Sequence, residues 1–442
     1  MPRPIVAIVG RPNVGKSTLF NRLIGERQAI VDDQPGITRD RVYGHTDWNG
    51  REFSVVDTGG LGLREEDPFH AHIRAQAEIA MEEADLILFV VDAREGLTPG
   101  DEAVAQLFRR SARPLLLVAN KADNVRREAD THEYFRLGLG EVLPISAHSG
   151  RGVADLLDEA VARFPAPEEM VEEDDEDRVR VAIVGRPNVG KSSLLNAILG
   201  EERVIVSPVA GTTRDAIDVP FEFRDQRYTL IDTAGIRRAG KIQGSVEFYT
   251  VLRAERAIER ADVGVLVVDA AMGLVDGDKR VGGMIRDAGR ACVVFLNKWD
   301  LVVGRTPKEF AQVVRQGIPF MGYAPLVTGS AEQGKGLGEL LESCADVANN
   351  HALRISTPEL NRVVHEAVDR RPYTSGGRDL KVYYAAQVSV KPPALVLFVN
   401  DPEIAHETYV RYLENQLRAA FGFQGTPLRV MLRKRGREDR ER

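Results

Sequence analysis

Only two cysteines, Cys292 and Cys344, occur among the 442 residues. This number is too small for a disulfide framework, and neither cysteine has metal-ligand spacing around it. The sequence also lacks an apolar run near the ~20 residues that cross a bilayer, since the longest run, Leu86–Val91, has the length of a strand. The N-terminus leads directly into an apolar segment at residues 5–9, without room for a signal peptide. We therefore expect a cytoplasmic, monomeric protein with reduced thiols and no membrane partner.

The net charge of −7 is unevenly distributed along the chain. Residues 349–442 carry 16 Lys+Arg and 11 Asp+Glu, a net charge of +5, whereas the first 348 residues sum to −12. Such asymmetry indicates a basic contact surface near the C-terminal end of an otherwise acidic protein.

The sequence repeats itself at an offset of 175 residues. Residues 6–17 recur at 181–192, residues 38–40 at 213–215, and residues 57–60 at 232–235 with one substitution. Because a period of this length exceeds any solenoid unit, it indicates two copies of a complete domain. A run rich in Asp and Glu lies between the copies and has the composition of a solvated linker. We predict a first domain at 1–165, a linker at 166–178, a second domain at 179–350 and a C-terminal domain at 351–442.

Each copy alternates short apolar segments with helical patterns. In the first copy, strands are expected at 4–9, 52–57, 86–92, 114–120 and 142–146, with helices such as 16–24, 70–84 and 153–164 between them. This alternation predicts an α/β fold with a mostly parallel sheet and helices on both faces.

The C-terminal domain has a different pattern. We expect a helix to about Arg370 with Thr357 as its N-cap and Pro358 at its first position, then strands at 380–388 and 394–400, a long helix at 402–421 and a last strand at 427–433. The order α-β-β-α-β predicts a small sheet with helices on one face.

A phosphate-binding loop occurs in both copies, as Gly-x4-Gly-Lys-Ser at residues 10–17 and 185–192. Each loop follows a strand and opens a helix, which is the context this motif requires. Backbone N–H groups surround the β-phosphate, the lysine bridges β- and γ-oxygens, and the serine ligates Mg²⁺. Asp57 and Asp232 end strands where they would hold the metal, and Thr38 and Thr213 would sense the γ-phosphate.

Base recognition is predicted from Asn-Lys-x-Asp at residues 120–123 and 297–300. A carboxylate accepts from both N1–H and the 2-amino group of guanine, whereas adenine would leave that buried acid unpaired. Ser-Ala pairs at 146–147 and 330–331 end later strands, where a backbone N–H can meet guanine O6. The ordered set predicts two GTP sites.

The predicted GTP-binding residues are Gly10, Asn13, Val14, Gly15, Lys16, Ser17, Thr18, Asp57, Gly60, Asn120, Lys121, Asp123, Ser146 and Ala147 in the first copy, and Gly185, Asn188, Val189, Gly190, Lys191, Ser192, Ser193, Asp232, Gly235, Asn297, Lys298, Asp300, Ser330 and Ala331 in the second. The predicted catalytic residues are Lys16, Thr38, Gly60, Lys191, Thr213 and Gly235. The predicted Mg²⁺ ligands are Ser17, Thr38, Asp57, Ser192, Thr213 and Asp232.

These motifs match the five GTPase motifs of the TRAFAC class, and the tandem arrangement resembles the Der/EngA family of bacterial ribosome-assembly GTPases over nearly the whole chain. The resemblance includes residues 232–238, 381–385 and 397–402. It implies a KH-like C-terminal domain and a role in maturation of the large (50S) ribosomal subunit through its rRNA.

Two features depart from generic GTPases. Leu61 and Ile236 stand where many GTPases carry a water-orienting glutamine. In similar GTPases an asparagine at the position of Asn13 or Asn188 helps to hold K⁺, which predicts K⁺-stimulated hydrolysis; local loop hydrogen bonding is the alternative.

The chain's Gly-x-x-Gly at 422–425 lies between a helix and a strand rather than between two helices, so we interpret it as a helix C-cap. The basic run at 433–437 is then the better candidate for phosphate contacts, although a solvated tail remains an equal alternative.

Two other functions stay open at this point. The first is an RNA-associated scaffold in which the nucleotide is structural and hardly turned over. The second is a GTPase acting in tRNA modification or membrane transport, which no modification domain or membrane segment supports.

Overall fold

The computed structural model describes residues 3–25, 43–60, 69–111, 113–164, 178–201, 204–206, 218–233 and 246–435. The chain divides into two compact units whose main boundary falls between Glu173 and Asp174.

The first unit contains a six-stranded sheet in the order β2-β3-β1-β4-β5-β6. Its strands are β1 (Ile5–Val9), β2 (Tyr43–Trp48), β3 (Arg51–Asp57), β4 (Leu86–Asp92), β5 (Leu115–Asn120) and β6 (Val142–Pro144). Only the edge strand β2 pairs antiparallel within this described sheet; the other pairs are parallel. Parallel strands bring their carboxyl ends to one edge, where the predicted motifs follow β1, β3, β5 and β6.

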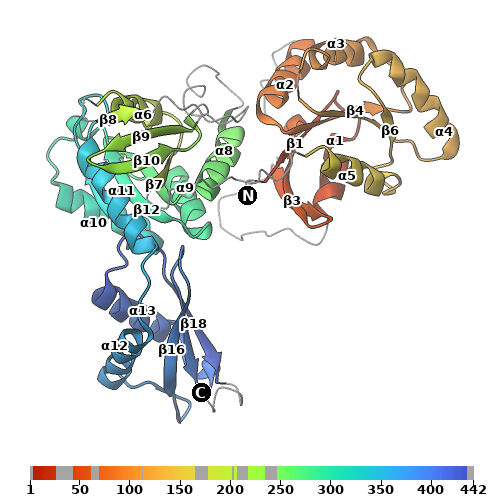
Figure 1. Ribbon diagram of the computed structural model, residues 1–442. Helices are drawn as coiled ribbons and strands as arrows, with labels where there is room; N and C mark the ends of the chain where they lie inside the picture. The colour runs from red at the N-terminus through yellow and green to blue at the C-terminus, as the bar shows by residue number, and fades with distance from the viewer. Residues whose placement is uncertain are drawn as a thin grey trace. The chain divides into compact units, whose positions relative to one another are not determined.

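Helices cover both faces of this sheet (Figure 1). They are α1 (Lys16–Ile24), α2 (Phe69–Glu83), α3 (Pro99–Phe108), α4 (Val125–Asp130) and α5 (Val153–Ala162), with 3₁₀ turns η1 (Thr58–Gly60) and η2 (Thr131–Leu137). Helices α1 and α5 share one apolar core with alternate residues of β1, β3 and β4. On the other face, Phe108 of α3 packs edge-on against Phe89 of β4.

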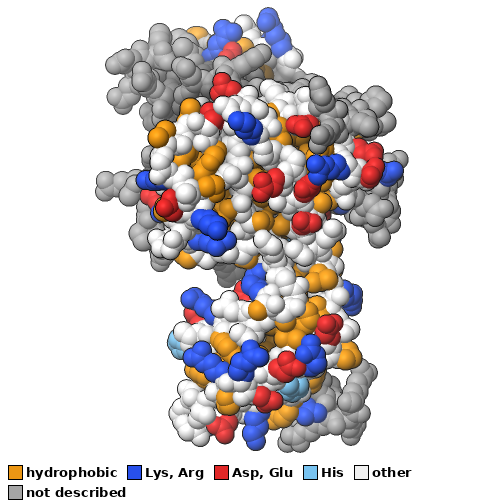
Figure 2. Space-filling view, turned by 90° about the vertical axis from the view of Figure 1, so that its left-hand side faces the viewer, with side chains coloured by type: hydrophobic (Ala, Val, Ile, Leu, Met, Phe, Trp, Pro, Cys, Tyr) orange, Lys and Arg blue, Asp and Glu red, His pale blue; other side chains and the backbone are white. Residues whose placement is uncertain are grey.

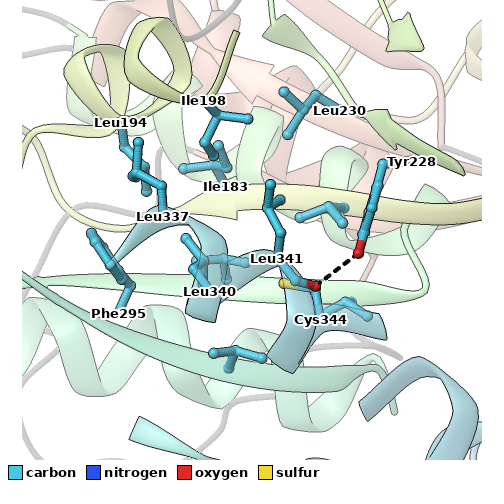
Figure 3. Packing of buried hydrophobic residues seen from close by; sticks show 14 of the residues in the cluster. Ile183, Leu194, Ile198, Tyr228, Leu230, Phe295, Leu337, Leu340, Leu341 and Cys344 are labelled. Atoms are coloured by element: carbon cyan, nitrogen blue, oxygen red, sulfur yellow. Dashed lines mark hydrogen bonds between the residues drawn. The ribbon is translucent and has the colours of Figure 1, made fainter. Parts of the chain in front are cut away.

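The second unit repeats this plan with seven strands in the order β13-β12-β11-β7-β10-β9-β8. The strands are β7 (Arg178–Val184), β8 (Val204–Val206), β9 (Val219–Phe223), β10 (Gln226–Leu230), β11 (Val263–Asp269), β12 (Ala291–Asn297) and β13 (Leu326–Thr328). The helices are α6 (Lys191–Leu199), α8 (Val246–Arg260), α9 (Asp276–Asp287), α10 (Pro307–Gly317) and α11 (Leu337–His351), with η3 (Trp299–Leu301) and η4 (Pro319–Met321). In the core shown in Figure 3, Leu340 and Leu341 of α11 pack toward β7 and β12, and the Tyr228 hydroxyl donates to the Leu341 carbonyl at 3.0 Å.

The same unit ends in a small α+β domain. It consists of α12 (Thr357–Arg370), β14 (Thr374–Ser375), β15 (Arg378–Asp379), β16 (Val382–Ser389), β17 (Ala394–Val399), η5 (Pro402–Ile404), α13 (Glu407–Phe421) and β18 (Arg429–Lys434). The order β16-β17-β18 forms a three-stranded sheet, and both long helices share one core with it. The predicted fold class is therefore confirmed: two α/β domains with mostly parallel sheets, then a small domain with helices on one face.

Some predicted elements need correction. Ser356, rather than Thr357, is the N-cap of α12, and Pro358 lies one position further in; proline is tolerated there because the first helical N–H groups have no intrahelical partner. The helix expected at 402–421 is broken, because Ala405 is extended after a 3₁₀ turn and the His406 side chain caps a new helix. Strand β2 and helix α3 were not predicted.

The C-terminal domain docks on the second GTPase-like fold through the Gly-x-x-Gly segment. The Gly425 N–H donates to the Tyr323 carbonyl at 2.8 Å, and its carbonyl accepts from the Cys292 N–H at 2.7 Å. Gly422 ends α13 with φ 89°, which confirms the C-cap interpretation. Since this segment carries interdomain hydrogen bonds, it cannot also clamp a nucleic-acid backbone as in a KH motif.

Candidate nucleotide-binding sites

The two glycine-rich loops have nearly the same geometry. The Lys16 ammonium donates to the carbonyls of Gly10 and Arg11, both at 2.8 Å, and Lys191 makes the equivalent bonds to Gly185 and Arg186 at the same distances. Burial lowers the pKa of each lysine to about 8. Both ammonium groups remain mostly protonated at neutral pH, so each loop presents a partly desolvated cation that is suited to a phosphate.

Glycine is required where the loop meets the strand that carries the predicted base-recognition motif. Gly15 has φ 95°, and a Cβ there would lie 2.3 Å from the Asn120 side-chain nitrogen. Gly190, with φ 97°, stands in the same relation to Asn297. Any side chain would therefore push the loop away from the strand that carries the predicted base-binding motif.

Each of these asparagines joins two loops. The Asn120 amide donates to the Val14 carbonyl at 2.8 Å and accepts from the Ala147 N–H at 2.9 Å. In the second copy Asn297 makes the same two bonds, to Val189 and from Ala331, at the same distances. The buried asparagine thus aligns the phosphate loop, the base motif and the Ser-Ala pair. From the sequence, these three were assigned to one site only because they occur in the expected order along the chain.

The predicted lysines of the base motif are held by acids that sequence reasoning missed. Lys121 contacts Asp92 at 2.5 Å and donates to the Asn13 carbonyl at 2.6 Å. Lys298 contacts Asp269 at 2.6 Å and donates to Asn188 at 3.0 Å. Both aspartates end a strand in the sequence Val-Val-Asp, at the same place in each copy. The recurrence of this tripeptide in the sequence repeat could have identified them.

A second missed pair fixes the arginine of each loop. Arg11 donates to Asp101 at 2.8 Å, and Arg186 lies 3.3 Å from Asp278. Both acids are fully buried at the start of a helix on the sheet's other face. The phosphate loop is thereby tied to α3 or α9 as well as to the base-recognition strand.

Two of the three predicted metal ligands of the first copy, Ser17 and Asp57, are adjacent. The Ser17 hydroxyl donates to Asp57 at 2.6 Å, and the other oxygen of Asp57 accepts from the Gly59 N–H at 2.9 Å. A serine hydroxyl and a carboxylate beside a phosphate loop form the oxygen donor set that Mg²⁺ prefers, so these residues fit the metal. In the second copy Asp232 has φ 53° and its N–H donates to Asp218 at 3.0 Å.

Asp123 is the predicted guanine-binding carboxylate of the first copy. It accepts from Arg94 at 2.5 Å, from Arg127 at 2.9 Å and from the Ser146 hydroxyl at 2.8 Å. The hydrogen bond from Arg94 is the main cause of a lowered pKa at Asp123. Asp300 is exposed, and among the described residues it has no such cation partner.

The two loop asparagines proposed for K⁺ adopt the same left-handed conformation, with φ 66° at Asn13 and Asn188. Both side chains are exposed. Within the described part of the chain neither amide forms a hydrogen bond, although the backbone carbonyls accept from the base-motif lysines. Local hydrogen bonding, the alternative considered from sequence, thus involves the backbone of these asparagines and not their side chains among the described residues.

The remaining predicted residues divide into two groups. Thr18 and Ser193 lie in the first turns of α1 and α6, Gly60 ends the turn η1 after β3, and Ser330 follows β13. Thr38, Thr213, Gly235, Leu61 and Ile236 lie outside the described residues, so the predictions for them remain untested.

Comparisons with known proteins agree with this geometry. Residues 5–121 and 180–298 match a family described as 50S ribosome-binding GTPase, and residues 354–433 match the KH-domain-like C-terminal domain of EngA bacterial GTPase enzymes. GTPase Der from Pelotomaculum thermopropionicum is 53% identical over 441 residues, which cover 99% of this chain and 100% of that protein. The chain belongs to the GTPase Der family. GTPase Der from Staphylococcus carnosus is 50% identical over 438 residues, 98% of this chain and 100% of that protein.

As a member of the Der family, the chain is a tandem GTPase that binds and hydrolyses GTP. GTPases of this kind generally bind nucleotide with Mg²⁺. Among solved structures, Era from Aquifex aeolicus bound to GDP.AlF4- is 25% identical and covers 59% of this chain and 88% of its own, with a TM-score of 0.30. None of the described helices is both long and apolar enough to span a membrane.

Proposed function

We propose that the protein is a GTP-gated assembly factor for the large ribosomal subunit. The observation that supports this most directly is that two segments matching 50S ribosome-binding GTPases precede a domain matching the EngA C-terminal domain. Two sites in one chain allow two nucleotide states to set its affinity for pre-ribosomal RNA.

In this proposal each residue of the first site has a defined role. Lys16, which bonds carbonyls of its own loop here, would bind the β- and γ-phosphates, and Ser17 and Asp57 would hold Mg²⁺. Asp123 accepts from guanine, and the Ala147 region meets the base O6. Thr38 and Gly60 would sense the γ-phosphate. The second site uses the residues at equivalent positions.

Hydrolysis is proposed to depend on K⁺. The exposed amides of Asn13 and Asn188, which have no hydrogen-bond partner among the described residues, are free to supply an oxygen ligand beside the phosphates. A cation there would stabilise the charge that develops on the β–γ bridge. Hydrolysis in KCl is expected to exceed that in NaCl by roughly tenfold or more, and equal rates in the two salts would refute this role.

Co-sedimentation with purified 50S subunits tests the ribosomal proposal. Binding is expected with a non-hydrolysable GTP analogue and not with GDP. Lys16→Ala and Lys191→Ala, measured separately, would show which site controls binding. Equal or absent binding in every state would contradict the proposal and favour a scaffold or another target.

A further inference from the structure

One face of the C-terminal sheet lies opposite the helices. Both α12 and α13 pack on the other face, in a core that includes Leu395, Leu397 and Val399 of β17 (Figure 1). Because side chains alternate along a strand, Val396 and Phe398 point to the opposite side. Met431 of β18 shares that side and is 44% exposed. The C-terminal domain therefore has a sheet face that neither α12 nor α13 covers, called the open face below; it is apolar at its centre, where Val396 is buried and Phe398 partly exposed.

The strand register arranges this open face in rows. Tyr384 pairs with Phe398, which in turn pairs with Arg433. The Tyr384 and Phe398 rings stack with centroids 4.2 Å apart and an interplanar angle of 14°. The next row continues through Val396 to Met431. The face thus presents two aligned aromatic rings next to a guanidinium group.

The charge of this sheet is of one sign. Strands β16, β17 and β18 contain no Asp or Glu, whereas β18 carries Arg429, Arg433 and Lys434. Directly after β18, the Arg435 guanidinium lies 5.0 Å from the centre of the Tyr383 ring. By contrast, acidic and basic side chains are interspersed on the side of this domain seen in Figure 2. Within these three strands the aromatic rings are accompanied by basic and not by acidic side chains, which matches a polyanion whose units have flat faces.

The Gly-x-x-Gly segment is not available for this task. Both the N–H and the carbonyl of Gly425 are bonded to the second GTPase domain. RNA contact by this domain must therefore use another surface.

We propose that the open sheet face binds single-stranded RNA, with bases stacked at Tyr384 and Phe398 and phosphates along β18. The inference rests on the proposed ribosomal function and specifies how the C-terminal domain would contact RNA. A duplex is not the expected ligand, because its base faces are already stacked on one another.

Fluorescence anisotropy with the full-length protein tests this surface. The probes are a fluorescein-labelled ten-nucleotide RNA strand and the duplex formed from the same strand. The single strand is expected to bind more tightly, and Phe398→Leu and Tyr384→Leu are each expected to weaken it by roughly fivefold or more. Arg433→Gln should weaken binding and make the salt dependence less steep by about 0.7 for each phosphate that the protein no longer neutralises.

Arg411→Gln is the matched control, because this arginine lies on α13 with a side chain that is 76% exposed; its affinity should equal that of the wild type. GTP hydrolysis in each variant reports that the GTPase domains are folded. Arg433 has little packing to lose, so Arg433→Gln keeps the test decisive if an aromatic variant unfolds.

The outcomes separate this inference from the function on which it rests. Unchanged affinity in Phe398→Leu and Arg433→Gln, or equal binding of strand and duplex, overturns the sheet-face proposal even if the wild type sediments with 50S subunits. If the wild type fails to sediment in every nucleotide state while these variants still lose affinity for the strand, the ribosomal proposal fails and the RNA surface stands.

Discussion

The two nucleotide sites of this chain share their architecture and differ at the carboxylate proposed to bind guanine. In both, a lysine that is buried (Lys16) or partly buried (Lys191) bonds two loop carbonyls at 2.8 Å, and a buried asparagine joins the phosphate loop to the Ser-Ala pair. In the first site, however, Asp123 is held by Arg94 and Arg127. Asp300 of the second site has no cation partner among the described residues.

The difference arises from single substitutions on a common backbone. The Arg94 N–H donates to Asp92 at 2.9 Å, and the Ala271 N–H donates to Asp269 at 3.0 Å in the same way. The second copy therefore has alanine where the first has the arginine that contacts Asp123. In the proposed guanine-binding role, the base would compete with Arg94 and Arg127 for Asp123, whereas Asp300 has no such competitor among the described residues. Identical motifs thus do not imply identical affinities.

The largest expected effect tests what the sites share. Lys16→Ala should reduce hydrolysis at the first site about 100-fold or more, because it removes the cation that stabilises the phosphates. Lys191→Ala should do the same at the second site only. Single-turnover measurements on each variant, compared with the double variant, give the rate of each site. Loss of all activity on changing one lysine would show that the sites are not independent.

An effect of intermediate size is expected on the pH dependence of stability, which should differ between the two units because His351 lies in the second. Burial, and then the charge of Arg290, lower the pKa of His351 to about 4, while Asp262 opposes this shift and Lys391 adds to it. The neutral imidazole, 2.6 Å from the Thr426 hydroxyl, is therefore favoured in the folded state. The stability that this neutral histidine contributes is complete above pH 6.5 and is lost as the pH falls toward 4. At pH 5 the free energy of unfolding should be lower by about 2 kcal/mol.

Urea denaturation of the wild type and His351→Gln at pH 7 and pH 5 measures this effect. Glutamine can keep a hydrogen bond to Thr426 but does not titrate, so the second unit of the variant should lose less stability at pH 5. The same loss in both proteins would assign the pH effect to other groups.

The smallest expected effect concerns the difference between the sites. Arg94→Ala should raise GDP affinity at the first site by about two- to fivefold, since an exposed ion pair contributes little. The side chains of Arg94 and Asp123 are 52% and 32% exposed, so solvent ions reach the pair and the change should diminish at high salt. Calorimetric titration in the Lys191→Ala background isolates this site. A fall in affinity would mean that Arg94 contacts the nucleotide instead of competing with it.

Much of the candidate site was predictable because its motifs are local. A strand, a glycine-rich loop and a helix follow one another within residues 5–24, so the chemistry of the loop can be read in order. Strands 86–92 and 115–120 were placed almost to the residue by their continuous apolar runs. Strand β2 was missed because its sequence, Tyr43–Trp48, lacks both an apolar run and regular alternation.

The sequence by itself determined two GTP sites, the α/β fold and the charge of the C-terminal end, because residue type and spacing set these directly. Tertiary structure alone decided that Arg94 pairs with Asp123, that Gly425 docks on Cys292, and that Tyr384, Phe398 and Arg433 share one open face. Each of these contacts joins residues distant in sequence. Their pairing depends on strand register and on how loops meet at a sheet edge, which local spacing does not specify.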